Sequence, residues 1–236
     1  MPSNQAIRIG DVEPFSIVDF PSHISAVVFM QGCPWRCPFC YNASLQPLKP
    51  NAESEWTFEK FLKFIERRKG MLDAVVFSGG EPLVQDALFD AVTAVKNLGY
   101  AIGLHTGGYR PEALKKVLPL LDWVGLDVKG PKEKYETLTG GFDAFDEMNK
   151  SLALLLSSKI PFECRTTCDP RLLNIDDLFE IGAFLKQAGA KEYYLQKYRP
   201  IETDKSTSDT DCESLISNKK LLSFLTDSFE KFEVRR

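Results

Sequence analysis

Residues 32–42, Gly-Cys-Pro-Trp-Arg-Cys-Pro-Phe-Cys-Tyr-Asn, are the stretch around which the chain is organised. They place Cys33, Cys37 and Cys40, half of the six cysteines, in the spacing C-x3-C-x2-C. Structural zinc sites usually close four ligands around the ion, often as two separated pairs. Three thiolates without a nearby fourth are more typical of an iron–sulfur cluster with one iron left open. The stretch therefore predicts a metal centre with a free position for chemistry.

Length and composition are those of an ordinary globular protein. The 236 residues suit one larger α/β domain or two small ones, and 44% of them are hydrophobic. The net charge of −4, with no basic block, argues against a general nucleic-acid binder. No apolar run approaches the roughly 20 residues of a membrane helix. We expect one domain over residues 1–236, with a core at about 20–200.

The N-terminal residues 1–8 lack the basic and apolar regions of a signal peptide. The sequence therefore predicts a cytoplasmic protein with neither a membrane nor a nucleic acid as partner. In a reducing compartment, cysteine clusters bind metals or do redox chemistry more often than they form disulfides. This expectation agrees with the metal centre that the cysteine spacing predicts.

Strand and helix patterns alternate along the chain. A β-prone lead-in at 8–19 precedes six predicted strands, at 24–30, 74–77, 101–104, 123–128, 160–167 and 192–198. Helical patterns separate them, and a last amphipathic helix is expected at 213–232, after a polar connection at 202–211. Such βαβ units predict a parallel sheet. Six units are too few for a closed eight-stranded barrel, so the fold is either a partly open barrel or a doubly wound sheet.

Unusual residues gather where the predicted strands end. The cysteines follow the first strand, residues 78–82 the second and residues 105–108 the third. Ligands of parallel α/β folds bind at this edge of the sheet. Alternation along the later strands also places polar side chains on one face. These later polar residues are Asp127 and Lys129 on the fourth strand, Glu163, Arg165 and Thr167 on the fifth, and Gln196 on the sixth.

These motifs together carry a family resemblance. The cysteine motif and Gly-Gly-Glu-Pro at 79–82 resemble the radical S-adenosylmethionine (AdoMet) superfamily. Within it, the chain is most similar to glycyl-radical-enzyme activases, and above all to activating proteins of anaerobic ribonucleoside-triphosphate reductase. The further matching stretches, within a similarity that runs from about 7 to 200, are Ser-Ile-Val-Asp-Phe-Pro at 16–21, Met-Gln-Gly-Cys at 30–33, His-Thr-Gly-Gly-Tyr at 105–109, Gly-Leu-Asp-Val-Lys-Gly at 125–130 and Arg-Thr-Thr at 165–167.

The resemblance implies a fold, cofactors and a reaction. The fold is a partial (β/α)6 TIM-like barrel with parallel strands and a C-terminal helix. Cys33, Cys37 and Cys40 hold a [4Fe–4S] cluster, whose open iron binds AdoMet. One electron, from a donor such as flavodoxin or ferredoxin, cleaves AdoMet to methionine and a 5′-deoxyadenosyl radical. That radical takes a hydrogen atom from a glycine of the partner enzyme.

The resemblance also implies residues that bind the cofactor. Phe39 and Tyr41 flank Cys40, where the family places an aromatic side chain against the adenine. Gly79 and Gly80 let the backbone approach the ligand closely, because they have no side chain. Glu81 is expected near the ammonium end of AdoMet.

Four more residues at strand ends complete the implied cofactor site. Asp127 and Lys129 match an Asp-x-Lys pair that lines it, and the fork of donors of Arg165 suits a carboxylate. His105 departs from the acidic residue of related activases, since a neutral imidazole supplies no fixed negative charge. Gln196 stands where some relatives have a histidine.

Other readings of the sequence stay open. A zinc or electron-transfer module would recruit Cys164, Cys168 or a histidine as fourth ligand, although these two cysteines fit packed core positions better. Cys212 is expected to be a bystander in the polar connection. A pyruvate formate-lyase-type activase is the alternative within the family. A small-molecule enzyme such as 7-carboxy-7-deazaguanine synthase is a further one.

Overall fold

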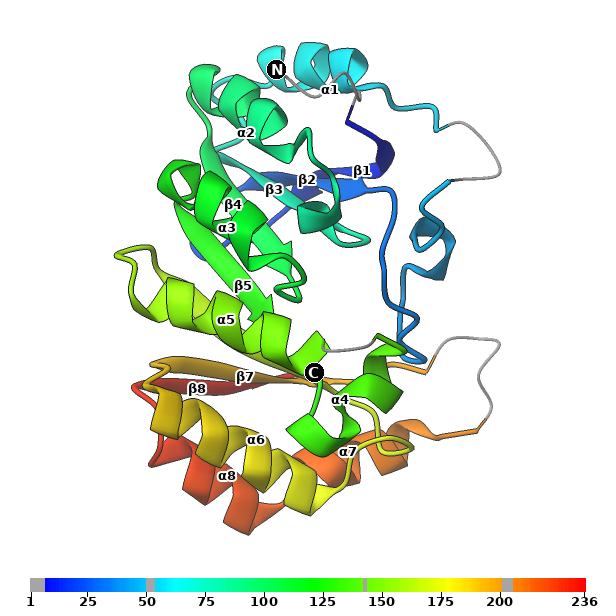
Figure 1. Cartoon of the computed structure of the whole chain (residues 1–236), viewed down its shortest axis with the longest axis vertical. Helices are drawn as coiled ribbons and strands as arrows, with labels where there is room; N and C mark the ends of the chain where they lie inside the picture. The colour runs from blue at the N-terminus through cyan, green and yellow to red at the C-terminus, as the bar shows by residue number, and fades with distance from the viewer. Residues whose placement is uncertain (1–6, 50–53, 142–143, 201–205) are drawn as a thin grey trace.

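A computed structural model describes residues 7–49, 54–141, 144–200 and 206–236 as an eight-stranded sheet with helices along it (Figure 1). The strands lie in chain order, β1 to β8. β1 pairs antiparallel with β2, and all later neighbours pair in parallel. Their bounds are β1 Ile9–Ser16, β2 Ser25–Met30, β3 Ala74–Gly79, β4 Ala101–Thr106, β5 Trp123–Asp127, β6 Phe162–Cys168, β7 Glu192–Lys197 and β8 Lys231–Arg235.

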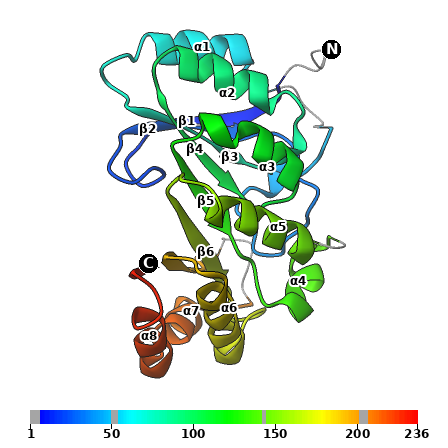
Figure 2. The same ribbon diagram turned by 60° about the vertical axis from the view of Figure 1, so that its left-hand side comes forward.

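The helices follow the strands and cover the outer face of the twisted sheet (Figures 1 and 2). Their bounds are α1 Phe58–Glu66, α2 Leu88–Asn97, α3 Pro111–Val117, α4 Lys132–Thr139, α5 Ala144–Leu156, α6 Ile175–Ala188, α7 Asp209–Ile216 and α8 Lys219–Thr226. This confirms the predicted α/β class with parallel strands. No helix in the described ranges is both long and apolar enough to cross a membrane.

The main core lies between the sheet and its helices. Alternate strand residues such as Val75, Phe77 and Leu104 are fully buried there against apolar helix residues. Cys164 and Cys168 belong to this core with no exposed surface, which confirms the expectation that they pack as small apolar side chains. The apolar side of each strand therefore faces outward to the helices, and its other side faces the concave interior of the sheet.

A second, smaller apolar cluster closes part of that interior. Phe20, in the connection from β1 to β2, packs there with Val27, Val76 and Trp123. The ring centres of Phe20 and Trp123 lie 5.6 Å apart. Gly103 on β4 leaves room for Phe20, since a Cβ at this glycine would lie 2.9 Å from the ring. The β1–β2 connection thus fills the interior below the ends of the strands.

The single helix expected at 213–232 is wrong. The structure has α7 and α8 there, followed by β8 on the edge of the sheet. The reason is a long-range ion pair: Arg235 donates to Glu163 on β6 over 2.6 and 2.8 Å, and Glu163 is fully buried. A buried carboxylate needs such a partner, which favours a strand beside β7 over another helical turn. Of the polar connection expected at 202–211, residues 202–205 lie outside the described ranges.

The other expected elements compare well with the structure. The six predicted strands are β2–β7, and the β-prone lead-in is β1. Helix α4 was not expected, because its sequence has a weak apolar pattern. Cys212 is buried in α7, so its expected place in a polar connection is wrong.

Replacing Phe20 with alanine tests the interior cluster. Phe20 is 4% exposed, and its loss should lower the free energy of unfolding by about 3–5 kcal/mol because it leaves a cavity. The matched control is Phe15→Ala, since Phe15 on the same hairpin is 55% exposed and should change stability by less than about 0.5 kcal/mol. Urea unfolding followed by circular dichroism measures both; equal losses would contradict the packing role.

Candidate active site

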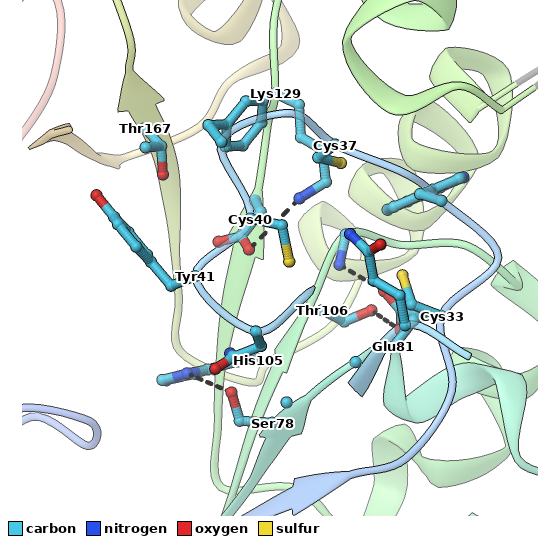
Figure 3. Close-up of a pocket in the computed structure, with 18 of the residues that line it drawn as sticks. Cys33, Cys37, Cys40, Tyr41, Ser78, Glu81, His105, Thr106, Lys129 and Thr167 are labelled. Atoms are coloured by element: carbon cyan, nitrogen blue, oxygen red, sulfur yellow. Dashed lines mark hydrogen bonds and ion pairs between the residues drawn. The ribbon is translucent and has the colours of Figure 1, made fainter. Parts of the chain in front are cut away.

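A cavity of about 160 Å³ opens at the carboxyl ends of the parallel strands (Figure 3). We call it the inner cavity. It is lined by the last residues of β3, β4, β5 and β6 and by the loops that follow β2, β3, β4 and β5. Its lining includes most predicted site residues, namely Cys33, Cys37, Phe39, Cys40, Tyr41, Gly79, Gly80, Glu81, His105, Asp127, Lys129 and Arg165. The structure therefore brings together residues that are up to 134 positions apart in the sequence, as Cys33 and Thr167 are.

The cysteine loop, residues 33–42, crosses this mouth after β2. Backbone hydrogen bonds fix its start, from Cys33 N–H to the Gln46 oxygen over 3.0 Å, and its middle, from Arg36 N–H to the Thr139 oxygen over 2.7 Å. Trp35 is buried beneath it, where Gly107 leaves space for the indole. All six cysteines are free thiols, and the three of the loop are partly exposed.

Gly79 and Gly80 dock the end of β3 against the start of the cysteine loop. Gly80 N–H donates to the Met30 oxygen over 2.9 Å. A Cβ on Gly79 would lie 2.4 Å from the Met30 nitrogen, and the φ of Gly79 is +100°. A Cβ on Gly80 would lie 2.3 Å from the Gly32 oxygen. Both glycines are therefore needed for contact between two backbone segments, in addition to the expected close approach to a ligand.

Glu81 joins this contact to the end of β4. Its N–H donates to the Gly32 oxygen over 2.9 Å. Its carboxylate accepts from Thr106 Oγ1 over 2.6 Å, from Gly107 N–H over 2.8 Å and from Leu83 N–H over 3.1 Å. Glu81 is only 2% exposed, and burial raises the pKa of its carboxyl against these hydrogen bonds. Its side chain is thus held by the protein on the wall of the cavity.

Two thiols of the cysteine loop, those of Cys33 and Cys37, have environments that disfavour bare thiolates. Burial, with the charge of Glu81 second, raises the pKa of Cys33 to about 12. Burial also raises the pKa of Cys37, although the Lys129 ammonium opposes it. Thiolates here require a positively charged group to replace their protons, and a metal centre is such a group. The donor set therefore fits an iron–sulfur cluster bound through Cys33, Cys37 and Cys40.

His105 is a neutral side chain in the lining of the inner cavity. Its Nε2 lies 2.9 Å from the backbone oxygen of Asp19. A carbonyl oxygen only accepts hydrogen bonds, so Nε2 carries the proton. Its Nδ1 lies 3.3 Å from Ser78 Oγ and accepts from that hydroxyl (Figure 3). Burial, with the Arg165 charge second, lowers the pKa of His105 to about 3. Both nitrogens are engaged, so this histidine is no free fourth ligand for zinc.

A network of charged side chains also lines the inner cavity, formed by Asp127, Arg165 and Lys129. Arg165 Nε donates to Asp127 Oδ1 over 2.9 Å, and its Nη2 lies 2.7 Å from the same oxygen. Lys129 Nζ is 3.8 Å from Asp127 Oδ2 and 5.8 Å from the ring centre of Phe39. Burial raises the pKa of the Asp127 carboxyl, but the charges of Arg165 and Lys129 outweigh burial and lower it. The fork of Arg165 thus binds this carboxylate of the chain itself.

The remaining predicted residues lie at different depths. Phe39 is buried beside Lys129, whereas Tyr41 is exposed at the rim. Gln196 does not line the inner cavity but a neighbouring one. The sequence analysis quoted the stretches 32–42 and 105–108 but assigned no site role to Trp35, Thr106 and Gly107 within them. Their roles depend on contacts between loops, which the sequence pattern does not show.

The alternative hypothesis of a zinc site gains no support from the described residues. Cys164 and Cys168 are buried in the main core and do not line the inner cavity. Within the described ranges, no three His, Cys, Asp or Glu side chains are grouped as ligands of a single ion. The three thiols instead line one cavity from separate positions of their loop, which suits a larger cluster.

A comparison with protein families identifies the superfamily to which this chain belongs. The model of the radical SAM superfamily matches residues 27–181, so the chain belongs to this superfamily. The family uses a [4Fe–4S] cluster and AdoMet, which confirms the predicted cofactors.

Curated relatives place the chain among the glycyl-radical-activating enzymes of the superfamily. A proposed glycyl-radical enzyme activating enzyme of Methanocaldococcus jannaschii is 29% identical over 201 residues, 81% of this chain and 80% of that protein. The pyruvate formate-lyase-activating enzyme of Clostridium pasteurianum is 36% identical over 58% of this chain and 61% of its own. That of Streptococcus mutans is 30% identical over 75% and 72%. The chain thus spans between about three fifths and four fifths of these relatives.

Solved structures support the partial-barrel fold. Native anSMEcpe with bound AdoMet superposes with a TM-score of 0.66 and 18% identity over 87% of this chain and 62% of that one. SuiB of Streptococcus suis gives a TM-score of 0.65 and 16% identity over 87% and 47%. At these identities, the likeness concerns the fold alone.

Changing Gly79 to alanine tests the docking of β3 on the cysteine loop. The variant should hold well under half of the wild-type iron after anaerobic reconstitution, because its Cβ would push against the Met30 backbone. Gly99→Ala is the matched control: its φ of +91° carries a similar backbone cost of about 1–2 kcal/mol, but no atom lies within 4 Å of the added Cβ. Equal iron contents in the two variants, measured by colorimetric assay, would contradict the role of this contact.

Proposed function

We propose that this protein generates a glycyl radical on a partner enzyme, and that the partner is anaerobic ribonucleoside-triphosphate reductase. The observation that carries the proposal is the inner cavity, where three cysteines of one loop face Lys129, Asp127 and Arg165 at strand ends. This arrangement fits an iron–sulfur centre with one position left for a cofactor. The motifs at 16–21, 105–109 and 125–130 support the choice of partner.

Each group of residues has its own part in the proposed reaction. Cys33, Cys37 and Cys40 would hold the cluster, which supplies the electron that cleaves AdoMet when both are bound. Lys129 keeps a positive charge beside the thiols: burial lowers its pKa, but the charges of Cys37 and Asp127 outweigh burial and raise it. Glu81 fixes the loops after β3 and β4 through its hydrogen bonds. Phe39, Gly79, Gly80 and Asp127 are proposed to line the AdoMet position, with Arg165 orienting Asp127.

The alternative partner within the family is pyruvate formate-lyase. Curated relatives that are called pyruvate formate-lyase-activating enzymes favour it. Both partners require the same chemistry at the inner cavity, so they differ only in the surface that docks there. A donor such as flavodoxin or ferredoxin and a cytoplasmic location complete the proposal, with residues 1–236 acting as one domain.

Electron paramagnetic resonance tests the partner directly. Reconstituted protein, reductant and AdoMet are mixed anaerobically with each candidate, and the expected result is a glycyl-radical signal on the ribonucleotide reductase. A signal on pyruvate formate-lyase alone would move the assignment to the alternative. Absence of a signal on both would contradict the proposed function.

Cys37→Ala is the matched variant for this experiment. It removes one thiol of the three, so iron content and the radical signal should both fall to background. Cys212→Ala is its control, because Cys212 is buried in α7 away from the inner cavity. Iron and radical retained in Cys37→Ala would contradict the ligand assignment.

A further inference from the structure

Tyr41 links the two sides of the barrel mouth. It directly follows Cys40, and its side chain is 52% exposed. Its ring is stacked on that of Tyr198, which follows β7, with centres 5.7 Å apart and planes at 15°. Its hydroxyl accepts a hydrogen bond of 2.7 Å from the N–H of Arg199. A stack and a hydrogen bond thus join the cysteine loop to a segment 158 residues away.

Tyr198 is a firm support for this contact. Its ring is buried, and the guanidinium of Arg171 lies 5.0 Å from the ring centre. Arg171 Nε in turn donates to both oxygens of the buried carboxylate of Asp169, over 2.9 and 3.1 Å. Tyr41 is therefore the solvent-accessible partner of the stack, while Tyr198 is packed between the segments that follow β6 and β7.

A second cavity, of about 700 Å³, lies beside the inner one. We call it the outer cavity. It extends to the ends of β7 and β8, where Gln196, Lys197, Arg199 and Arg235 line it. Five residues line both cavities, namely Tyr41, His105, Asp127, Arg165 and Thr167.

Tyr41 stands at the boundary between the two cavities. Among the described residues, it is the member of the cysteine loop that also lines the outer cavity. The other four shared residues come from β4, β5 and β6 and belong to the sheet. Figure 3 shows the Tyr41 side chain extending away from Cys40, toward the side of Thr167. It thus lies between the thiols and the outer cavity.

We propose that Tyr41 is a positioning residue that separates the inner from the outer cavity through its contact with Tyr198 and Arg199. Resting on the proposed function, the inference is that this partition keeps other hydrogen donors from the reacting atoms until the partner's glycine is in place. Exclusion of solvent is a general way to prevent side reactions of reactive intermediates. The role differs from the adenine contact that the family resemblance implies for an aromatic beside Cys40.

The first test needs no cofactor and no partner. In cluster-free protein, opening the partition should make Cys40, which is already partly exposed, more accessible to iodoacetamide. Tyr41→Ala should raise its alkylation rate roughly tenfold, because a stack and a hydrogen bond are both lost. Tyr41→Phe keeps the stack and should raise the rate only about threefold. Mass spectrometry of the Cys40 peptide gives both rates.

The matched control for this test is Tyr109→Ala. Tyr109 also contacts the cysteine loop, through Trp35 with ring centres 5.9 Å apart, but it lines neither cavity. Its loss should leave the Cys40 rate near that of the wild type. Equal rates in the wild type and Tyr41→Ala, or equal increases in Tyr41→Ala and Tyr109→Ala, would overturn the proposal. Circular dichroism verifies that each variant is folded.

The second test measures how tightly AdoMet cleavage is coupled to glycyl-radical formation in the enzyme that holds its cluster. Dithionite supplies one electron for each AdoMet cleaved, and 5′-deoxyadenosine counts the cleavages, whether the hydrogen atom comes from the partner's glycine or from another donor. Tyr41→Ala should raise the ratio of deoxyadenosine to glycyl radical roughly tenfold, with Tyr41→Phe in between. A merely structural role would lower both products together and leave the ratio unchanged, which would overturn the proposal.

The two tests distinguish a failure of the proposed partition from a failure of the proposed function. If the wild type makes no glycyl radical, the proposed function fails, whereas the alkylation rates still decide whether Tyr41 separates the cavities. If alkylation does not respond to Tyr41 while the glycyl radical forms normally, the partition fails alone. A raised KM for AdoMet with unchanged alkylation would favour the adenine contact and overturn the partition.

Discussion

The contact between the end of β3 and the start of the cysteine loop is the constraint on which the site depends. Gly80 and Glu81 donate to the Met30 and Gly32 oxygens, and the Glu81 carboxylate continues the connection to Thr106 and Gly107. A Cβ on either glycine would meet backbone atoms at 2.4 Å or less. One tripeptide therefore fixes the positions of the loops after β2, β3 and β4 relative to one another.

Charged side chains surround the inner cavity beside this contact. Glu81 and Asp127 are carboxylates beside the inner cavity, and Lys129 and Arg165 balance them. The partly buried thiols of Cys33 and Cys37 have raised pKa values, so they favour a bound metal over free thiolates. His105 stays neutral because burial lowers its pKa and because both of its nitrogens are engaged. A neutral histidine thus lies where the family resemblance predicts an acidic residue.

Local patterns predicted much of this arrangement. The cysteine spacing, the Gly-Gly-Glu-Pro turn and the polar residues at strand ends all lie within short stretches, and parallel strands bring such ends to one edge. The pairing of Glu163 with Arg235 could not be predicted, because it joins residues 72 positions apart and determines that β8 is a strand. The contact of Tyr41 with Tyr198 and Arg199 is of the same long-range kind. The contact of Gly79 and Gly80 with the backbone of Met30 and Gly32 could not be predicted either, because it joins separate segments of the chain.

The central claim is that the three thiols hold a cluster with one iron open to AdoMet. The most direct measurement is electron paramagnetic resonance of the reduced, reconstituted protein, with and without AdoMet. We predict the signal of a reduced [4Fe–4S] cluster, with about four irons per chain, that changes when AdoMet is added. A chain that binds one zinc ion and no iron, or a cluster signal that AdoMet leaves unchanged, would contradict the account.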